Sequence, residues 1–337
     1  MAAQNNQPLG WKGRLKQLIS DNNKNHGVRN KIVSVDTKKD REEILFQSFN
    51  QLREHGFLIK NPINFQERHF IVLLRLWLDQ GLSASTIQKK ASVIRVFCGW
   101  INKGNMIKTL EHYITPEEKH RVTRRQATEV DKSWNPNGVS SKDMIAKMEL
   151  FDVRLAAQMK MIEAFGLRRE EAISFRPRRA VALGSDTNSI VIEYGTKGGR
   201  IRTLPIDSDE RREALDYALK QVSTMEEHIG WLDLTLQQAI RKFKYGMEKF
   251  DVTKKGLGVT AHGLRHEYLS DEQERLTGEA SPVRGGDASK IDPVKLKEAQ
   301  LIVSARAGHS RPSITTAYCG SFNANKKTRC VINANQK

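Results

Sequence analysis

The stretch HGLRH, residues 262–266, is the part of this sequence that decides its fold and its chemistry. On a helix, His262 and Arg265 stand three residues apart and therefore share one face. Two histidines and an arginine among apolar neighbours call for an explanation, and a satisfied core histidine is the simplest one. Taken alone, the stretch is compatible with a structural role or with a catalytic one.

Four further short motifs accompany HGLRH in the second half of the chain. Each has an ordinary explanation when taken singly, such as an arginine-rich helix start or a turn lysine beside two glycines. Five independent motifs in one basic chain are improbable as a set of accidents, so we interpret them as parts of one site. In chain order the four are FGLRREE (165–171), TKGGR (196–200), AGHS (307–310) and TTAY (315–318).

The motifs supply the groups that transfer of a DNA strand requires when neither metal nor ATP takes part. The phenol of Tyr318 can attack a phosphodiester and hold the cut strand as a covalent ester. Arg168 and Arg265 carry planar forks that stay charged at any working pH and can bind the non-bridging phosphate oxygens. A nucleophile and a phosphate clamp are therefore both present.

The remaining polar groups suit the proton transfers of such a reaction. Lys197, on a predicted hairpin turn, can give a proton to the departing 5′ oxygen. A phenol is mostly protonated at neutral pH, and His262 can accept or share its proton. His309 can donate to the phosphate, while Glu171, one turn from Arg168, can orient a neighbouring side chain.

In these motifs the chain resembles the tyrosine recombinases, the integrase family of phages and integrative elements. GLR..E, the hairpin lysine, HxLRH, GHS and a TTxxY-type motif all correspond, although SITTAY has one residue fewer between the threonines and the tyrosine. The resemblance covers nearly the whole chain and is least specific at its N-terminal end. The roles it implies are a phosphate clamp of Arg168 and Arg265, a general acid Lys197, a base or proton shuttle His262, a phosphate donor His309, a supporting acid Glu171 and a nucleophile Tyr318.

The resemblance also implies partners and an order of events. It implies a clamp around double-stranded DNA at attachment sites and a homotetramer that joins two such sites, with the free chain a monomer. It implies strand exchange in two rounds through a four-way junction, and an accessory DNA-bending or directionality factor.

The pattern of the whole chain predicts a mainly α protein with a small antiparallel β-sheet, in the α+β class. Apolar residues at helical spacing predict helices within 41–56 and 65–81, each closed by a glycine, and within 82–101, which Ser83 or Ser85 would cap. A stripe from Met144 to Ile162 predicts one long helix. The expected divisions are a basic N-terminal arm (1–35), a helical core-binding domain of the SAM-like type (36–120), a linker (121–139), and a catalytic tyrosine-recombinase domain (140–337) with a surface insertion at about 271–292 and a tail at 319–337.

Two alternating stretches around the Gly198-Gly199 turn signal predict a β-hairpin. In SIVIEY, residues 189–194, the apolar set is Ile190, Ile192 and Tyr194. In RIRTLPI, residues 200–206, the alternation is counted over Ile201, Thr203 and Pro205. The hairpin would hold Lys197 at its tip.

The charge of the chain predicts its class of partner. Its 337 residues include 56 Lys and Arg against 39 Asp and Glu, a formal net charge of +17. Such an excess favours polyanions through steering and counterion release, so nucleic acid is the expected partner. Candidate DNA contacts, for which a solvated surface is the ordinary alternative, are Lys89, Lys90 and Arg95 in a predicted helix and Arg124 and Arg125 in the predicted linker.

Other protein classes find little support in the sequence. No stretch approaches the roughly 18 consecutive apolar residues of a membrane span, and the N-terminus lacks the apolar run of a secretory signal. The three cysteines lack metal or redox spacing, and Cys319 is interpreted as a bystander of Tyr318. We therefore expect a cytoplasmic, nucleoid-associated bacterial protein that uses no metal, cofactor or membrane.

Three alternatives remain at this point. A type IB topoisomerase-like enzyme uses a similar set of tyrosine, arginine and lysine. The two histidines within the motifs and the helical first domain favour the recombinase. A catalytically silent DNA-binding protein of the same fold is disfavoured because every expected catalytic position is filled. An RNA-binding or chromatin-like protein would require all five motifs to be accidents.

Overall fold

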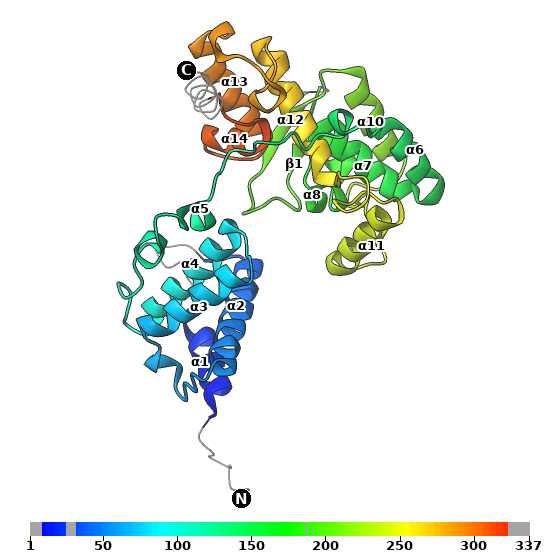
Figure 1. Cartoon of the computed structure of the whole chain (residues 1–337). Helices are drawn as coiled ribbons and strands as arrows, with labels where there is room; N and C mark the ends of the chain where they lie inside the picture. The colour runs from blue at the N-terminus through cyan, green and yellow to red at the C-terminus, as the bar shows by residue number, and fades with distance from the viewer. Residues whose placement is uncertain (1–8, 25–31, 187, 323–337) are drawn as a thin grey trace, which may run out of the picture. The chain divides into compact units, whose positions relative to one another are not determined.

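The computed structural model describes residues 9–24, 32–186 and 188–322 of the chain. It divides the chain into two compact units, Met1–Arg125 and Gln126–Lys337, which we call unit 1 and unit 2. Over these residues the fold is mainly helical with one two-stranded antiparallel sheet, as predicted (Figure 1). No helix in the described part of the chain is long and apolar enough to cross a membrane. Most of the predicted tail lies outside the described residues.

Unit 1 is a helical bundle around an aromatic core. Phe49, Phe65 and Phe97 are buried and meet with ring centroids 5.6 to 5.9 Å apart. The side chains of Ser34 and Ser83 cap the two longest helices at their N-termini. The elements are α1 (Trp11–Asn22), α2 (Val35–Glu54), η1 (Pro62–Asn64), α3 (Glu67–Asp79), α4 (Ala84–Trp100), η2 (Leu110–Tyr113) and α5 (Lys119–Val122).

Part of the expected N-terminal arm belongs to this bundle. Helix α1 buries Leu15 and Ile19 in the same core. Its Trp11 stacks on Phe49 with 6.1 Å between the ring centroids. The short apolar spacing at Leu15 and Ile19 was therefore a packing signal, because only one turn of helix separates the two side chains.

Unit 2 is built around helix α7, against which α6, α10 and α12 pack. Trp134, which lies in the predicted linker, is fully buried here, and its indole donates to the carbonyl of Thr260 at 2.8 Å. The elements are η3 (Asn135–Asn137), α6 (Ser141–Phe151), α7 (Val153–Phe165), α8 (Arg169–Ile173), α9 (Pro177–Ala182), β1 (Ser189–Ile192), β2 (Arg202–Pro205), α10 (Asp209–Leu219), α11 (Leu236–Lys249), α12 (Ala261–Thr277), η4 (Pro282–Arg284), η5 (Ala288–Lys290), α13 (Pro293–Arg306), η6 (Pro312–Thr315) and α14 (Thr316–Cys319).

The predicted long helix from Met144 to Ile162 is two helices, so that prediction was wrong. The chain breaks at Asp152, whose backbone is extended (φ −156°, ψ 107°). Its carboxylate accepts from the backbone N–H groups of Arg154 and Leu155 and from the indole of Trp231. A capping aspartate in the middle of an apolar stripe ends one helix and starts the next.

The β-hairpin forms, but its inward face in the second strand differs from the prediction. Strands β1 and β2 pair antiparallel, with Ile190 opposite Leu204 and Ile192 opposite Arg202. Leu204 and Arg202 are therefore buried, whereas Ile201 is 60% exposed. Counting the alternation from Ile201 placed the strand one residue out of step, which exchanges the two faces.

Much of the predicted surface insertion at 271–292 is packed structure. Helix α12 continues to Thr277, and Ser281 and Pro282 are buried. Arg284 forms ion pairs with Asp131, Asp271 and Glu274. This segment also contacts α14, since a side chain on Gly320 would come within 2.9 Å of the backbone nitrogen of Val283. The segment therefore supports the end of the chain that carries Tyr318.

Candidate active site

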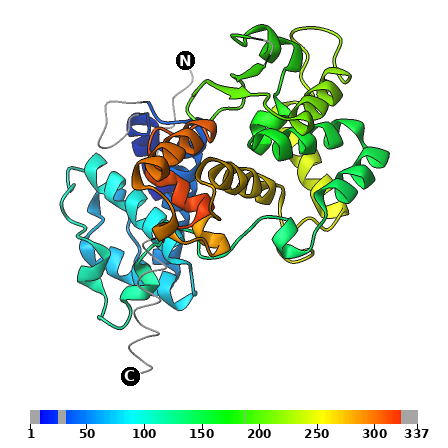
Figure 2. The same cartoon turned by 90° about the horizontal axis from the view of Figure 1, so that it is seen from above.

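Four segments of unit 2 bring six of the seven predicted catalytic side chains together, and a fifth segment carries Lys197. Helices α12, α13 and α14 lie side by side at one end of the unit (Figure 1, Figure 2). The end of α7 runs into the turn before α8 at the same place. The turn before α8 carries Arg168 and Glu171 follows on α8; the β1–β2 turn carries Lys197; α12 carries His262 and Arg265; the loop after α13 carries His309; and α14 carries Tyr318.

A glycine makes the sharp turn that delivers Arg168. Gly166 ends α7 in the left-handed region at φ +60°, and a side chain there would meet the ring of Tyr268 at 2.3 Å. Its carbonyl oxygen accepts a hydrogen bond from Arg265. Only glycine fits both the backbone angle and the close approach, so the FGLR motif is a structural requirement of the site.

One backbone carbonyl holds both arginines of the predicted phosphate clamp. The Nη2 of Arg168 donates to the oxygen of Ala307 at 2.7 Å, and the Nη2 of Arg265 donates to the same oxygen at 2.6 Å. Arg265 is fully buried, and its Nε has no hydrogen-bond partner within the described residues. A buried, unsatisfied cationic donor is costly unless a ligand supplies the acceptor, as a phosphate oxygen would.

Glu171 is completely buried between the arginines. It accepts from the Arg168 side chain at 2.6 Å and from the Arg168 backbone at 2.8 Å. Both terminal nitrogens of Arg202 also donate to it, at 2.8 and 2.7 Å. Burial alone would raise the pKa of Glu171, but the hydrogen bonds and charges of Arg202 and Arg168 outweigh it and lower the pKa to about 2. The carboxylate is therefore ionised at neutral pH.

Tyr318 lies within this cluster, with 9% of its surface exposed. Its hydroxyl is 3.4 Å from the Nε2 of His309, which is itself 3.2 Å from the Nη2 of Arg168. The guanidinium of Arg265 is 5.4 Å from the centre of the tyrosine ring. The backbone oxygen of Tyr318 lies 3.4 Å from the Nδ1 of His266. Tyr318 and the two arginines of the predicted clamp therefore lie close together within one chain.

The histidines around Tyr318 are neutral at neutral pH. Burial, followed by the charges of Arg168 and Arg265, lowers the pKa of His309 to about 4. Desolvation by neighbouring groups, followed by the charges of His266 and Arg265, lowers the pKa of His262 as well. The His262 ring lies 5.9 Å from the Tyr318 ring and is still exposed to solvent. A neutral imidazole near the phenol can accept its proton.

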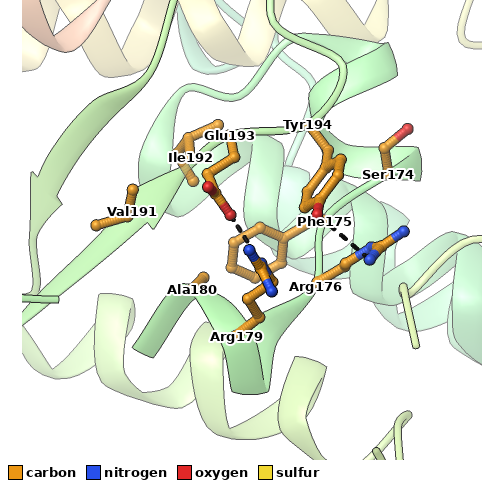
Figure 3. A pocket seen from close by; sticks show the side chains of 9 residues that line it. All are labelled: Ser174, Phe175, Arg176, Arg179, Ala180, Val191, Ile192, Glu193 and Tyr194. Atoms are coloured by element: carbon orange, nitrogen blue, oxygen red, sulfur yellow. Dashed lines mark hydrogen bonds and ion pairs between the residues drawn. The ribbon is translucent and has the colours of Figure 1, made fainter. Parts of the chain in front are cut away.

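Lys197 is placed differently from the other catalytic candidates. It lies on the exposed β1–β2 turn, and its charge, after those of the arginines, contributes to the lowered pKa of His309. Two arginines contact the base of the hairpin (Figure 3). Arg179 pairs with Glu193 at 2.9 Å, and Arg176 lies 4.1 Å over the ring of Tyr194. The turn therefore extends from an anchored base.

The five predicted DNA contacts outside the motifs have varied surroundings in unit 1. Lys89 pairs with Asp40 at 2.7 Å, and Lys90 lies 5.5 Å over the ring of Trp77. Arg95 donates to the backbone oxygen of Lys108 at 2.7 Å, which fixes a loop. Arg124 and Arg125 are exposed. Their contact with DNA stays a prediction.

The sequence analysis missed two residues of the site, Arg202 and His266. Arg202 is a charged residue at an inward position of a strand, and the one-residue error in the alternation hid it. His266 is the second histidine of HGLRH, one helical turn after His262, with 5.0 Å between its ring and that of Tyr318. The i, i+4 spacing within the motif was the available signal.

The described part of the chain contains no group of three or more His, Cys, Asp or Glu side chains that could hold a metal ion. Cys319 follows the tyrosine directly, but burial raises the pKa of its thiol to about 12. A thiol of that pKa stays protonated and does not compete as a nucleophile.

Comparison with known proteins finds one matching family model. Residues 125–271 match the model of a protein family described as Integrase. No protein in a search of curated sequences matches the chain. The matched range includes Arg168, Lys197 and Arg265.

Solved structures show the same fold at low sequence identity. A lambda integrase dimer bound to a COC′ core site is 12% identical with a TM-score of 0.58, and the match covers 94% of this chain and 78% of that one. The Tn1549 transposon integrase in complex with circular intermediate DNA is 14% identical with a TM-score of 0.57, covering 94% and 98%. A lambda integrase tetramer bound to a Holliday junction is 13% identical with a TM-score of 0.54, covering 93% and 78%. Residues 125–271 are thus similar to the family described as Integrase, and the chain shares the fold of the lambda and Tn1549 integrases.

Proposed function

We propose that this chain is a site-specific DNA recombinase in which Tyr318 cleaves a strand and holds it as a 3′-phosphotyrosine ester. One observation carries the proposal. The Tyr318 hydroxyl lies 3.4 Å from His309, which lies 3.2 Å from Arg168, and Arg265 is 5.4 Å from the tyrosine ring. A nucleophile beside two cationic forks matches what attack on a phosphodiester requires.

The chemistry exchanges one ester for another. The phenol oxygen of Tyr318 bonds to phosphorus, and the bond from phosphorus to the 5′ oxygen breaks. Arg168 and Arg265 stabilise the charge on the non-bridging oxygens as it develops. Attack by a 5′ hydroxyl on the phosphotyrosine reverses these events and joins the strands. The phosphotyrosine ester stores the energy of the broken phosphodiester bond, so neither metal nor ATP is consumed.

Two proton transfers accompany the exchange. His262, neutral at working pH, accepts the phenol proton from Tyr318. Lys197, on its exposed turn, gives a proton to the departing 5′ oxygen once DNA fills the space in front of the clamp. His309 donates to the phosphate from its place between Arg168 and Tyr318.

The substrate is double-stranded DNA at paired attachment sites. The net charge of +17 supports a polyanionic partner. The neighbours in fold include DNA-bound dimers and a tetramer on a Holliday junction, which supports a homotetramer that joins two sites through a four-way junction. We further propose a monomeric free chain and an accessory DNA-bending or directionality factor.

A covalent-adduct assay tests the proposal. Suicide duplexes from a library of the flanking genome, each nicked just 3′ of a candidate cleavage position, trap the intermediate because the short product diffuses away. Wild type is expected to give a protein–DNA adduct that survives boiling in detergent, and Tyr318→Phe is expected to give none. Tight DNA binding by wild type without an adduct anywhere in the library would overturn the proposal in favour of a silent DNA-binding protein.

A further inference from the structure

Arg202 lies directly behind the phosphate clamp and has no role in the motifs. It begins strand β2, five positions after Lys197, and is 8% exposed. Both of its terminal nitrogens donate to Glu171, at 2.8 and 2.7 Å. A buried arginine held in this bidentate way is fixed in orientation as well as in charge.

The charges around Glu171 explain why this arginine matters. The carboxylate is 2.6 Å from the Nη1 of Arg168 and 3.9 Å from that of Arg265, in addition to its pair with Arg202. Three positive side chains thus face a single negative one. Without Arg202, the carboxylate would be shared between the two clamp arginines alone and would cancel half of their charge.

The position of Arg202 also connects two parts of the site. A side chain on Gly308 would come within 3.2 Å of Arg202 and 3.3 Å of Arg168, so both guanidinium groups border the turn that precedes His309. Through β2, the same residue is joined to the hairpin that carries Lys197. A shift of Arg202 would therefore displace both the clamp and the base of the hairpin.

We propose that Arg202 is a positioning residue of the strand-transfer reaction. It neutralises Glu171, so that this carboxylate can orient Arg168 without withdrawing positive charge from the DNA phosphate. The inference rests on the proposed function of the site. It assigns to Arg202 an effect on the rate of cleavage that is separate from any effect on folding.

The first measurement compares adduct formation by wild type and Arg202→Met on a suicide duplex that wild type cleaves. The rate is expected to fall on the order of 10- to 100-fold, because the unneutralised carboxylate of Glu171 offsets part of the positive charge that the clamp offers to the phosphate. Affinity for the duplex should change by less than about threefold, since many phosphate contacts share the binding. The double variant Glu171→Gln/Arg202→Met restores the excess of two positive charges and should regain most of the lost rate.

A matched control separates positioning from stability. Arg211 is also 8% exposed and pairs with a buried carboxylate, Glu272, in the same unit. Arg211→Met should lower the melting temperature by a similar amount and leave the rate of adduct formation per folded molecule unchanged. Equal losses of rate in Arg202→Met and Arg211→Met would show that only a buried ion pair had been lost, and would overturn the proposal.

The pH dependence supplies a readout that folding alone would not give. Without Arg202, Glu171 loses the partner that contributes most to its lowered pKa, so it takes up a proton at a higher pH than in wild type. The other charged groups that face it, Arg168 and Arg265, remain. The rate of Arg202→Met relative to wild type should therefore rise as the pH falls.

The outcomes are distinguishable. An Arg202→Met rate within twofold of wild type would overturn the inference alone. An absence of adduct with wild type across the library would overturn the proposed function and, with it, this inference.

Discussion

Two buried carboxylates in unit 2 are each surrounded by three arginines, but the two clusters differ in how many negative charges they contain. The clamp cluster is Glu171 with Arg168, Arg202 and Arg265. The structural cluster is Glu272 with Arg211, Arg275 and Arg306, and it contains a second carboxylate, Asp207, which pairs with all three of these arginines.

The second carboxylate is the difference that matters. In the structural cluster, three positive charges meet two negative ones, and the ion pairs close on themselves. In the clamp cluster, three positive charges meet one, and the Nε atoms of Arg202 and Arg265 lack hydrogen-bond partners within the described residues. An arrangement left short of one anion is a site for an anion, and under the proposed function the phosphate of DNA supplies it.

The largest expected effect comes from the clamp. Arg168→Lys keeps the charge but removes the planar fork that holds Glu171 and Ala307. The rate of adduct formation should fall on the order of 10²- to 10³-fold, as expected for loss of a transition-state donor. Arg211→Lys, measured in the same assay, should keep the wild-type rate. A fully active Arg168→Lys would remove the distinction between the two clusters.

The structural cluster should respond in stability. Glu272 is 3% exposed, and Glu272→Gln removes the carboxylate that all three arginines share. The free energy of unfolding, measured with denaturant, should fall by about 3–5 kcal/mol, the usual result of breaking a buried ion pair. The rate of adduct formation per folded molecule should stay at the wild-type value, and a marked loss of that rate would place Glu272 in the catalytic machinery.

A smaller effect is expected from the packed segment behind α14. Arg284 joins this segment to Asp131 and, within the segment, pairs with Asp271 and Glu274. Arg284→Ala should lower the free energy of unfolding by about 1–3 kcal/mol, the cost of unsatisfied buried partners. It should also slow adduct formation severalfold, because η4 contacts the helix that carries Tyr318. An unchanged rate would make the segment a purely structural addition.

The smallest effect is a pH dependence of stability. Burial, followed by the charge of Lys132, lowers the pKa of His266 to about 4. The unfolded chain, with the ordinary histidine pKa near 6.5, therefore binds this proton first as the pH falls. The part of the folded state's stability that depends on a neutral His266 is fully present above pH 6.5. It is lost progressively as the pH falls toward 4. Between pH 7 and 5 the free energy of unfolding should fall by about 1–2 kcal/mol more in wild type than in His266→Asn, and parallel curves would contradict the assignment.

The sequence predicted the parts of this molecule that depend on local spacing. HGLRH lies on a helix with His262 and Arg265 toward the same site, as its i, i+3 spacing predicted. The sequence pattern did not predict the break at Asp152, where a side-chain cap outcompetes an otherwise continuous apolar stripe. Nor did it find Arg202, because a charged residue at an inward strand position becomes intelligible only when its distant partner, Glu171, is known.

The central claim is that Tyr318 becomes covalently bound to DNA, and peptide mapping of the adduct tests it most directly. The trapped wild-type adduct is digested with nuclease and protease, and the peptide that carries the phosphate is sequenced by mass spectrometry. The account predicts a phosphate or nucleotide on Tyr318. Attachment to any other residue, such as Tyr268 or Cys319, would contradict it.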